Sequence, residues 1–251
     1  MIPDFLDEYK EEIKKYELET IRIEATPVTE EESLPIIQSK FLGFPYLPND
    51  VQYPKDKKGK PMIMLAQINF AEIPYLAGYP TSGILQFFIP STDWYDMDDY
   101  KVLFHDNITL AYQKDFAFLT KALYDECPVY CEHSLIFEKF VEYGGTEDCR
   151  FNLEFAGKDY FDFYETLTKV EQKQMDNIFD ATGHKIGGYA YFTQDDPRGY
   201  DSTKKSDVLL LQIDTDDKIM FGDSGVANLF ITPEHLRLKQ LDKAYFNWDC
   251  C

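Results

Sequence analysis

The polar residues that could bind a ligand lie inside apolar segments and occur twice. Lys40 recurs as Lys185 and Gln67 recurs as Gln212, since 185 − 40 and 212 − 67 both equal 145. A glutamine buried in an apolar strand needs hydrogen-bond partners, because an unpaired amide costs a few kcal/mol. Two interpretations stay open. Each glutamine ties its strand to the loop beside the neighbouring lysine, or the four side chains border a cleft that holds an anionic or peptide-like group.

In the cleft interpretation, aromatic and acidic residues near the repeated segments complete the lining, namely Tyr46, Tyr191, Trp94 and Asp223. The predicted ligand-binding set is then Lys40, Gln67, Lys185, Gln212, Trp94 and Asp223. None of these side chains supplies a convincing general base or nucleophile, so no catalytic residue is predicted.

Gly222-Asp223-Ser224-Gly225 can be compared with the nucleophile loop of trypsin-like proteases. A nucleophile elbow has the spacing Gly-x-Ser-x-Gly, and Val226 stands where its last glycine is needed. No suitable His and Asp context precedes the serine. Hairpin turns favour the same residue types, so we predict a turn.

Potential metal ligands are loosely spaced. Cys127, Cys131 and His133, with Cys149 further on, contain one loose pair, whereas structural zinc sites use two matched pairs. The acidic sets at 93–99 and 214–217 lack the order of an EF-hand loop. Buried free thiols and solvated turns account for these residues, so no metal and no cofactor are predicted.

Three sequence blocks recur in one order and predict an internal duplication. Residues 40–46 correspond to 185–191 and residues 65–69 to 210–214 at an offset of 145, while 83–89 correspond to 225–231 at 142. A near-constant offset is rare among unrelated apolar strands. We predict one α+β domain over residues 1–251, with an internally duplicated, mostly antiparallel sheet unit and flanking helices. The repeat halves span approximately 36–92 and 183–234.

Local patterns predict the surrounding elements. Apolar residues at three- and four-residue spacing predict a helix at 4–19, and alternation predicts a strand at 20–25. Further strands are predicted at 62–70, 83–89, 134–141, 226–231 and 245–249. A helix is predicted at 168–181 with Gly183 as its C-terminal cap. Thr29 to Glu32 has capping-box spacing, and Thr232 with Pro233 starts a last short helix.

The charge balance limits the possible partners. The chain has 25 Lys+Arg against 45 Asp+Glu, a net charge of −20. It therefore repels a polyphosphate backbone and an anionic membrane surface, so neither nucleic acid nor membrane is a predicted partner. A basic protein or a cation is compatible with it. No export signal opens the chain and no apolar run could span a bilayer, so we expect a cytoplasmic protein.

Several of these segments together resemble the YwqG-like family, and the resemblance covers about residues 36 to 251. The residues that carry it are Lys40–Pro48, Leu65–Asn69, Gly83–Phe88, Gly222–Gly225 and Asn247–Cys250. Leu42 departs from the pattern, where glycine is more common, as at Gly187, and Ala190 lacks the proline seen at Pro45. The resemblance implies an α+β, cytoplasmic and mostly bacterial protein with no assigned activity, so it transfers no catalytic residues.

Two functions are consistent with these features. The first is a non-catalytic binding protein whose acidic, aromatic surface holds a protein partner, for example an immunity-type protein that neutralises a basic toxin. The alternative is a small-molecule-binding protein or hydrolase with its site in the cleft between the two repeats. Exposed acidic residues around Trp94 and Tyr95 would favour the first, and a deep pocket beside Lys40, Lys185 or Asp223 would favour the second.

Overall fold

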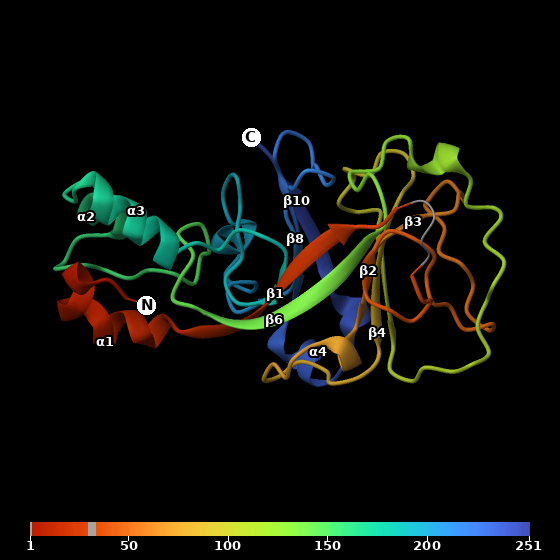
Figure 1. The fold of residues 1–251 in the computed structure, drawn as a ribbon, viewed down its shortest axis with the longest axis horizontal. Helices are drawn as coiled ribbons and strands as arrows, with labels where there is room; N and C mark the ends of the chain where they lie inside the picture. The colour runs from red at the N-terminus through yellow and green to blue at the C-terminus, as the bar shows by residue number, and fades with distance from the viewer. Residues whose placement is uncertain (1, 30–33) are drawn as a thin grey trace.

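One antiparallel sheet joins strands from both ends of the chain (Figure 1). The computed structural model describes residues 2–29 and 34–251. Within them the sheet has ten strands, in the order β10-β9-β8-β7-β1-β6-β2-β3-β4-β5. The strands are β1 (Leu18–Pro27), β2 (Lys40–Phe41), β3 (Ile63–Asn69), β4 (Ile84–Ile89), β5 (Lys101–His105), β6 (His133–Glu142), β7 (Lys185–Gly187), β8 (Val208–Ile213), β9 (Val226–Ile231) and β10 (Tyr245–Asp249). Every pair of neighbours is antiparallel.

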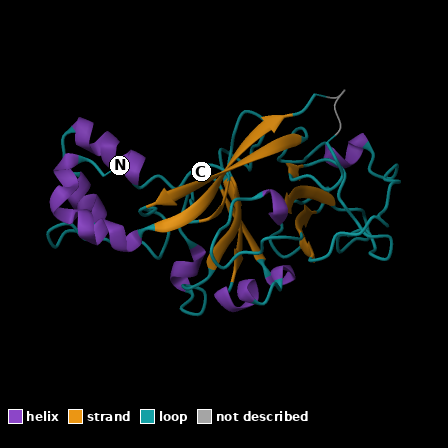
Figure 2. Ribbon diagram, turned by 60° about the horizontal axis from the view of Figure 1, so that its bottom comes forward, coloured by secondary structure: helices purple, strands orange, loops and turns teal. Residues whose placement is uncertain are grey.

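The helices of the described residues are short. The α-helices are α1 (Lys10–Ile13), α2 (Tyr160–Tyr164), α3 (Lys169–Ile178) and α4 (Pro233–Arg237). The 3₁₀ turns are η1 (Asp4–Tyr9), η2 (Lys14–Tyr16), η3 (Phe70–Glu72), η4 (Lys121–Tyr124), η5 (Pro197–Tyr200) and η6 (Leu241–Lys243). The domain is therefore mostly β, which corrects the predicted α+β class, although the single domain and the antiparallel sheet are as predicted. Figure 2 shows α1, α2 and α3 gathered at one end of the molecule, away from most of the sheet.

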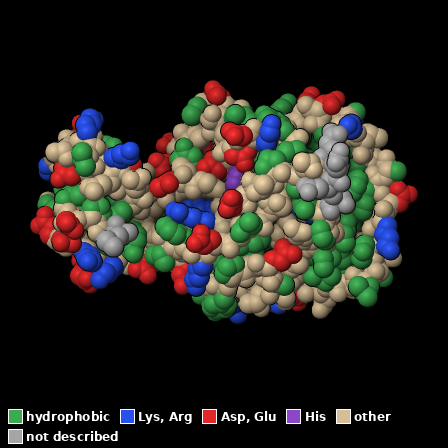
Figure 3. All heavy atoms as spheres, viewed as in Figure 1, with side chains coloured by type: hydrophobic (Ala, Val, Ile, Leu, Met, Phe, Trp, Pro, Cys, Tyr) green, Lys and Arg blue, Asp and Glu red, His purple; other side chains and the backbone are tan. Residues whose placement is uncertain are grey.

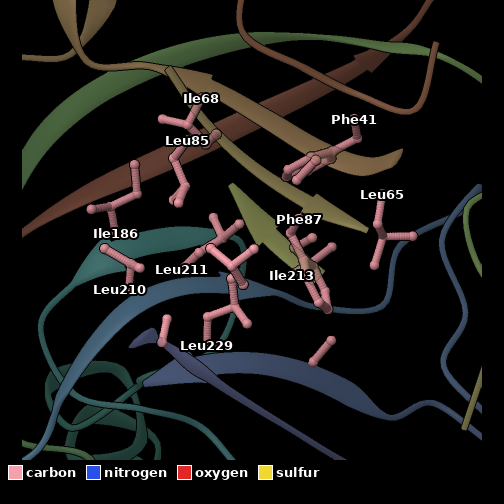
Figure 4. Close-up of a cluster of buried hydrophobic side chains, with 14 of the residues drawn as sticks. Phe41, Leu65, Ile68, Leu85, Phe87, Ile186, Leu210, Leu211, Ile213 and Leu229 are labelled. Atoms are coloured by element: carbon pink, nitrogen blue, oxygen red, sulfur yellow. The ribbon is translucent and has the colours of Figure 1, made fainter. Parts of the chain in front are cut away.

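Two cores stabilise the domain. The larger one lies inside the curl of the sheet, where apolar side chains of both edges meet (Figure 4). Phe87 of β4 and Phe246 of β10 have ring centroids 5.0 Å apart, although seven strands lie between β4 and β10 in the sheet order. The smaller core joins the N-terminal turns to α2 and α3 through Leu6, Ile13, Phe155, Met175 and Phe179. The long β1–β6 pair connects the helical end to the main body (Figure 1).

Strands β2-β3-β4 and β7-β8-β9 form two units of matching register. Lys40 pairs with Gln67, and Gln67 pairs with Gln86. In the second unit Lys185 pairs with Gln212, and Gln212 pairs with Asn228. Each unit has a register shift at the same place, between Met64 and Ala66 and again 145 residues later between Leu209 and Leu211.

The turn after β2 repeats in the turn after β7. Leu42 and Gly187, 145 positions apart, both have positive φ, +60° and +73°. This conformation is easy for glycine and strained for leucine. Gly43 and Gly188 follow with φ of +81° and +73°. A side chain at either glycine would collide with a carboxylate, that of Glu132 or Glu142.

Most of the predicted strands are confirmed, and two predicted helices differ in their bounds. The helix predicted at 4–19 is instead the continuous series η1, α1 and η2, which ends at Tyr16 because β1 already begins at Leu18. Helix α3 ends at Ile178 with Phe179 as its C-cap, so Gly183 is not the cap. The Thr29–Glu32 capping box extends outside the described residues. The turn at 222–225 is confirmed by the hydrogen bond from Gly225 N to Phe221 O.

Candidate functional site

Gln67 uses all of its amide hydrogen-bonding groups inside the protein. Its Oε1 accepts from Tyr46 N at 2.7 Å and from Gln86 Nε2 at 2.8 Å. Its Nε2 donates to the carbonyls of Ile36 and Gln38 at 2.8 and 2.9 Å. The side chain is fully buried. This geometry fixes the loop before β2 and the loop after it to the central strand.

Gln212 makes the same contacts 145 residues later. Its Oε1 accepts from Tyr191 N at 2.8 Å, and its Nε2 donates to the carbonyls of Ala181 and Gly183 at 2.9 and 2.8 Å. Asn228 then donates to Tyr191 O at 2.9 Å, as Gln86 does to Tyr46 O at 2.6 Å. Neither glutamine has a polar atom left to hold a ligand.

The two lysines of the predicted set are buried beside glutamates. Lys185 Nζ lies 2.8 Å from Glu142 Oε1, and both side chains are at most 2% exposed. Lys40 Nζ lies 3.5 Å from Glu132 Oε1, and Glu132 is 23% exposed. Burial lowers the pKa of both lysines, and the glutamates oppose this shift. Each lysine is thus paired with a glutamate at one end of β6, a strand that lies outside both units.

The structure does not bring the six predicted residues into one cleft. The polar row of the first unit contains Lys40 and Gln67, and that of the second contains Lys185 and Gln212. Strands β6 and β1 lie between β2 and β7, so these two rows are roughly 14 Å apart across the sheet. Phe41, Ile68 and Phe87 face the main core, and their neighbours in the strands, Lys40 and Gln67, point to the opposite face. Trp94 packs against the main core. The rows and Trp94 therefore lie on different faces of the sheet.

Trp94 and the turn that holds Asp223 both contact the C-terminal strand or the residues that follow it. The Trp94 ring lies 4.9 Å from the Trp248 ring and 5.8 Å from the Phe221 ring. Gly222 backs onto Trp248, which places Asp223 at the rim of this aromatic group. Trp248 Nε1 donates to Tyr95 O at 3.0 Å, and Cys251 N donates to Asp223 O at 3.3 Å. The C-terminus is thus tied to the turn at 222–225.

This region is both exposed and acidic, and we define the Trp94 surface by its residues Asp93, Trp94, Tyr95, Asp96, Met97, Asp98, Asp99, Asp223 and Trp248. Tyr95 is 55% and Met97 43% exposed. Lys58 contacts Asp93 at 2.6 Å and Lys57 contacts Asp96 at 3.3 Å. The hydrogen bond from Lys58 lowers the pKa of Asp93. Five carboxylates against these two lysines leave a local charge of −3.

Four side chains with metal-binding or catalytic potential lie near one another between the two units, namely Cys131, His133, His184 and Asp216. The sequence analysis did not place them together. Cys131 Sγ lies 4.0 Å from His133 Nε2. His184 Nδ1 accepts from Asp214 N at 2.9 Å, so its proton is on Nε2, which donates to Asp216 at 3.2 Å. That tautomer leaves His184 no lone pair for a metal.

The thiol of this group is not activated. Burial raises the pKa of Cys131 and lowers the pKa of His133. Both shifts favour the neutral thiol and the neutral imidazole over a thiolate–imidazolium pair. The spacing Cys-x-His was visible in the sequence, whereas His184 and Asp216 come from a distant segment. The pairing of Val129 with Ile219 and the hydrogen bond from Ile23 N of β1 to His184 O help to bring them near.

Asp148, Cys149 and Asp196 form the one group of metal-type ligands that the described residues bring within 4.8 Å of each other. Arginines already neutralise it. Arg198 Nη2 lies 2.9 Å from Asp148 and 2.7 Å from Asp196, and all three side chains are at most 3% exposed. Arg150 makes a two-pronged contact with Asp148 at 2.9 and 2.7 Å. The guanidinium groups take the role that a cation would have.

The Asp148 contacts predict a pH dependence of stability. Burial alone would raise the pKa of Asp148, but the hydrogen bonds and charges of Arg150 and Arg198 outweigh it and hold that pKa well below its usual range. Its stabilising contribution is therefore complete above the unfolded pKa of about 3.9 and is lost as pH falls below it. We expect the free energy of unfolding to fall less between pH 5 and pH 3 in Asp148→Asn than in the wild type. Urea titrations measure this difference, and equal losses would contradict it.

None of the six predicted ligand-binding residues lines either of two open grooves. One is lined by Ile2, Phe5, Gln174 and Ile178 at the helical end, and another by Ile37, Glu72 and Ile136. Within residues 2–29 and 34–251, no helix has the length and apolar character that crossing a bilayer requires.

The fold and these contacts define a mostly-β protein whose repeated polar side chains hold the sheet together from within. Residues 39–250 match the family described as Domain of unknown function (DUF1963), and the chain belongs to this family. Among curated proteins, no relative matches the sequence.

Proposed function

We propose that the protein is a non-catalytic binding protein that holds a basic protein partner on the Trp94 surface. The observation that carries the proposal is the exposed ring of Tyr95 beside the partly buried Trp94 and Trp248, surrounded by carboxylates that two lysines neutralise only in part. Aromatic residues dominate binding hot spots, and complementary charge speeds association. An immunity-type protein that neutralises a basic toxin is one concrete form of this function.

The wider surface supports a basic partner as well. Acidic side chains are scattered over the face in Figure 3, with basic and apolar side chains between them, and the chain carries a net charge of −20. The alternative, a small-molecule site or hydrolase site between the repeats, has less support. The amides of Gln67 and Gln212 already form hydrogen bonds with backbone groups. The lysines that would border that site are already paired with glutamates.

We also infer that the two units arose by internal duplication, with halves near 36–92 and 183–234. The inference is supported by the hydrogen bonds of Gln67 and Gln212, whose partners also differ by 145 positions. The resemblance to the YwqG-like family, and with it a bacterial, cytoplasmic setting, belongs to the same proposal.

Capture of the tagged chain's partner from host lysate tests the binding function. At low salt we expect one basic protein to co-purify, and at about 0.3 M salt we expect much less of it, because exposed charges are screened beyond a few ångströms. Mass spectrometry identifies the captured species. Recovery of a stoichiometric small molecule in place of a protein would contradict the proposal.

A further inference from the structure

One edge of β6 lacks a strand partner over most of its length. The strand has 10 residues, but β2 pairs with it only at His133 and Ser134. On that side, no described residue forms a backbone hydrogen bond with residues 135–142. Backbone N–H and C=O groups are obligatory hydrogen-bonding groups, so such an edge is a template for a further strand.

The register identifies the backbone groups that point to this open edge. Successive residues of an antiparallel strand direct their backbone groups to opposite sides. Ile23 N donates to His184 O at 2.9 Å, on the β7 side of β1, so Ile23 does not bond to its β6 partner Phe137. Every second residue of β6 therefore turns its N–H and C=O to the open edge, namely Leu135, Phe137, Lys139 and Val141.

The chain that precedes β2 is held away from this edge. The carbonyls of Ile36 and Gln38 accept from Gln67 Nε2, and the carbonyl of Ile37 accepts from Asn69 Nδ2 at 3.1 Å. These contacts fix residues 36–38 to β3, so they do not continue the β2–β6 ladder. A groove of about 570 Å³ remains, lined by Ile37, Glu72 and, from β6, Leu135, Ile136 and Phe137.

The two faces of a strand added here would meet different side chains. On one face, Leu135 is buried and Phe137 packs against the main core. On the other face, Ile136 is 62% exposed and Glu138 is also exposed. Side chains directly opposite each other on neighbouring strands interact. The first face therefore favours apolar residues in the added strand, and the second favours basic ones.

Carboxylates outnumber cations beside this edge. Glu24, which pairs with Ile136 in the register, adds to the charges of Glu138 and Glu72. Arg22 lies opposite Glu138 and supplies one positive charge, whereas Lys139 is already paired with a glutamate of β1 at 2.7 Å. Three carboxylates against one free cation leave a charge of −2, which complements a basic strand.

We propose that an extended segment of a partner protein, with apolar and basic residues in alternation, adds to the open edge of β6 as an eleventh strand of the sheet. In this mode of recognition, main-chain hydrogen bonds supply affinity and the alternate side chains supply specificity. The site is separate from the Trp94 surface, and it stands whether or not that surface binds a partner.

Amide hydrogen exchange of the full chain, measured by NMR, tests strand addition. The probe is an acetylated hexapeptide of alternating valine and lysine. At saturation we expect the amides of Phe137 and Lys139 to exchange at least about tenfold more slowly, because the peptide carbonyls accept from them. The amides of Ile136 and Glu138 already face β1 and should change less than about twofold. Unchanged exchange at Phe137 and Lys139 would overturn the proposal.

Two controls separate strand pairing and charge from non-specific binding. A peptide with proline in place of its central valine should give no protection, since proline lacks the N–H that the ladder needs. Glu24→Gln/Glu138→Gln should weaken binding about three- to tenfold, and Asp162→Asn/Glu165→Gln, the same charge change at the helical end, should leave it unchanged. Equal protection by the proline peptide, or equal affinity of both variants, would refute the proposal.

Discussion

Replacing Gln67 by methionine is expected to lower the free energy of unfolding by about 3–6 kcal/mol. The substitution keeps the length of the side chain but leaves Tyr46 N, Gln86 Nε2 and two loop carbonyls without their partner. Each buried group left unpaired costs about 1–3 kcal/mol, with partial relaxation. Urea denaturation followed by tryptophan fluorescence measures the loss.

Gln212→Met provides the matched comparison within the same chain. Its amide makes three hydrogen bonds within the protein rather than four, so we expect a loss that is large but smaller than that of Gln67→Met. If either substitution changed stability by less than about 1 kcal/mol, which is usual for surface positions, the glutamines would not be the ties that the geometry indicates.

Lys185→Met is expected to cost about 3–5 kcal/mol, because it leaves the carboxylate of Glu142 buried without its ion-pair partner. Tyr189 N still donates to Glu142 at 2.8 Å, but one neutral donor does not replace a charge. Lys40→Met should cost less, since Glu132 is partly exposed and can be hydrated. Chemical denaturation of both variants tests the order.

The double variant Lys185→Met/Glu142→Gln gives the control for this prediction. It removes both charges, so we expect it to recover part of the stability that Lys185→Met loses. An equal or larger cost for Lys40→Met than for Lys185→Met would contradict the assignment, because burial of the partner carboxylate is the physical cause of the difference.

Short-range patterns in the sequence predicted much of the sheet. Alternation and apolar runs located β3, β4, β6 and β9, and the offset of 145 located Lys40, Gln67 and their counterparts. The ties made by both glutamines agree with the first of the two interpretations drawn for them. These features depend on local periodicity and on repetition, and both can be read directly from the amino-acid sequence.

Features that depend on distant pairing could not be predicted. The insertion of β1 and β6 between the two units separates Lys40 from Lys185, and no local pattern indicates it. Arg198 lies in a turn-like segment, yet it is fully buried between two aspartates. Trp94 meets Trp248 across 154 positions, and that contact creates the surface on which the proposed function depends.

Charge reversal on the Trp94 surface tests the binding function most directly. Asp98→Lys/Asp223→Lys changes two exposed residues at its rim, and Asp162→Lys/Glu165→Lys makes the same change of net charge at the helical end. We expect capture of the basic partner to fall at least tenfold with the first variant and to stay near the wild-type level with the second, in the same buffer. Equal recovery with both variants would contradict a partner site at Trp94.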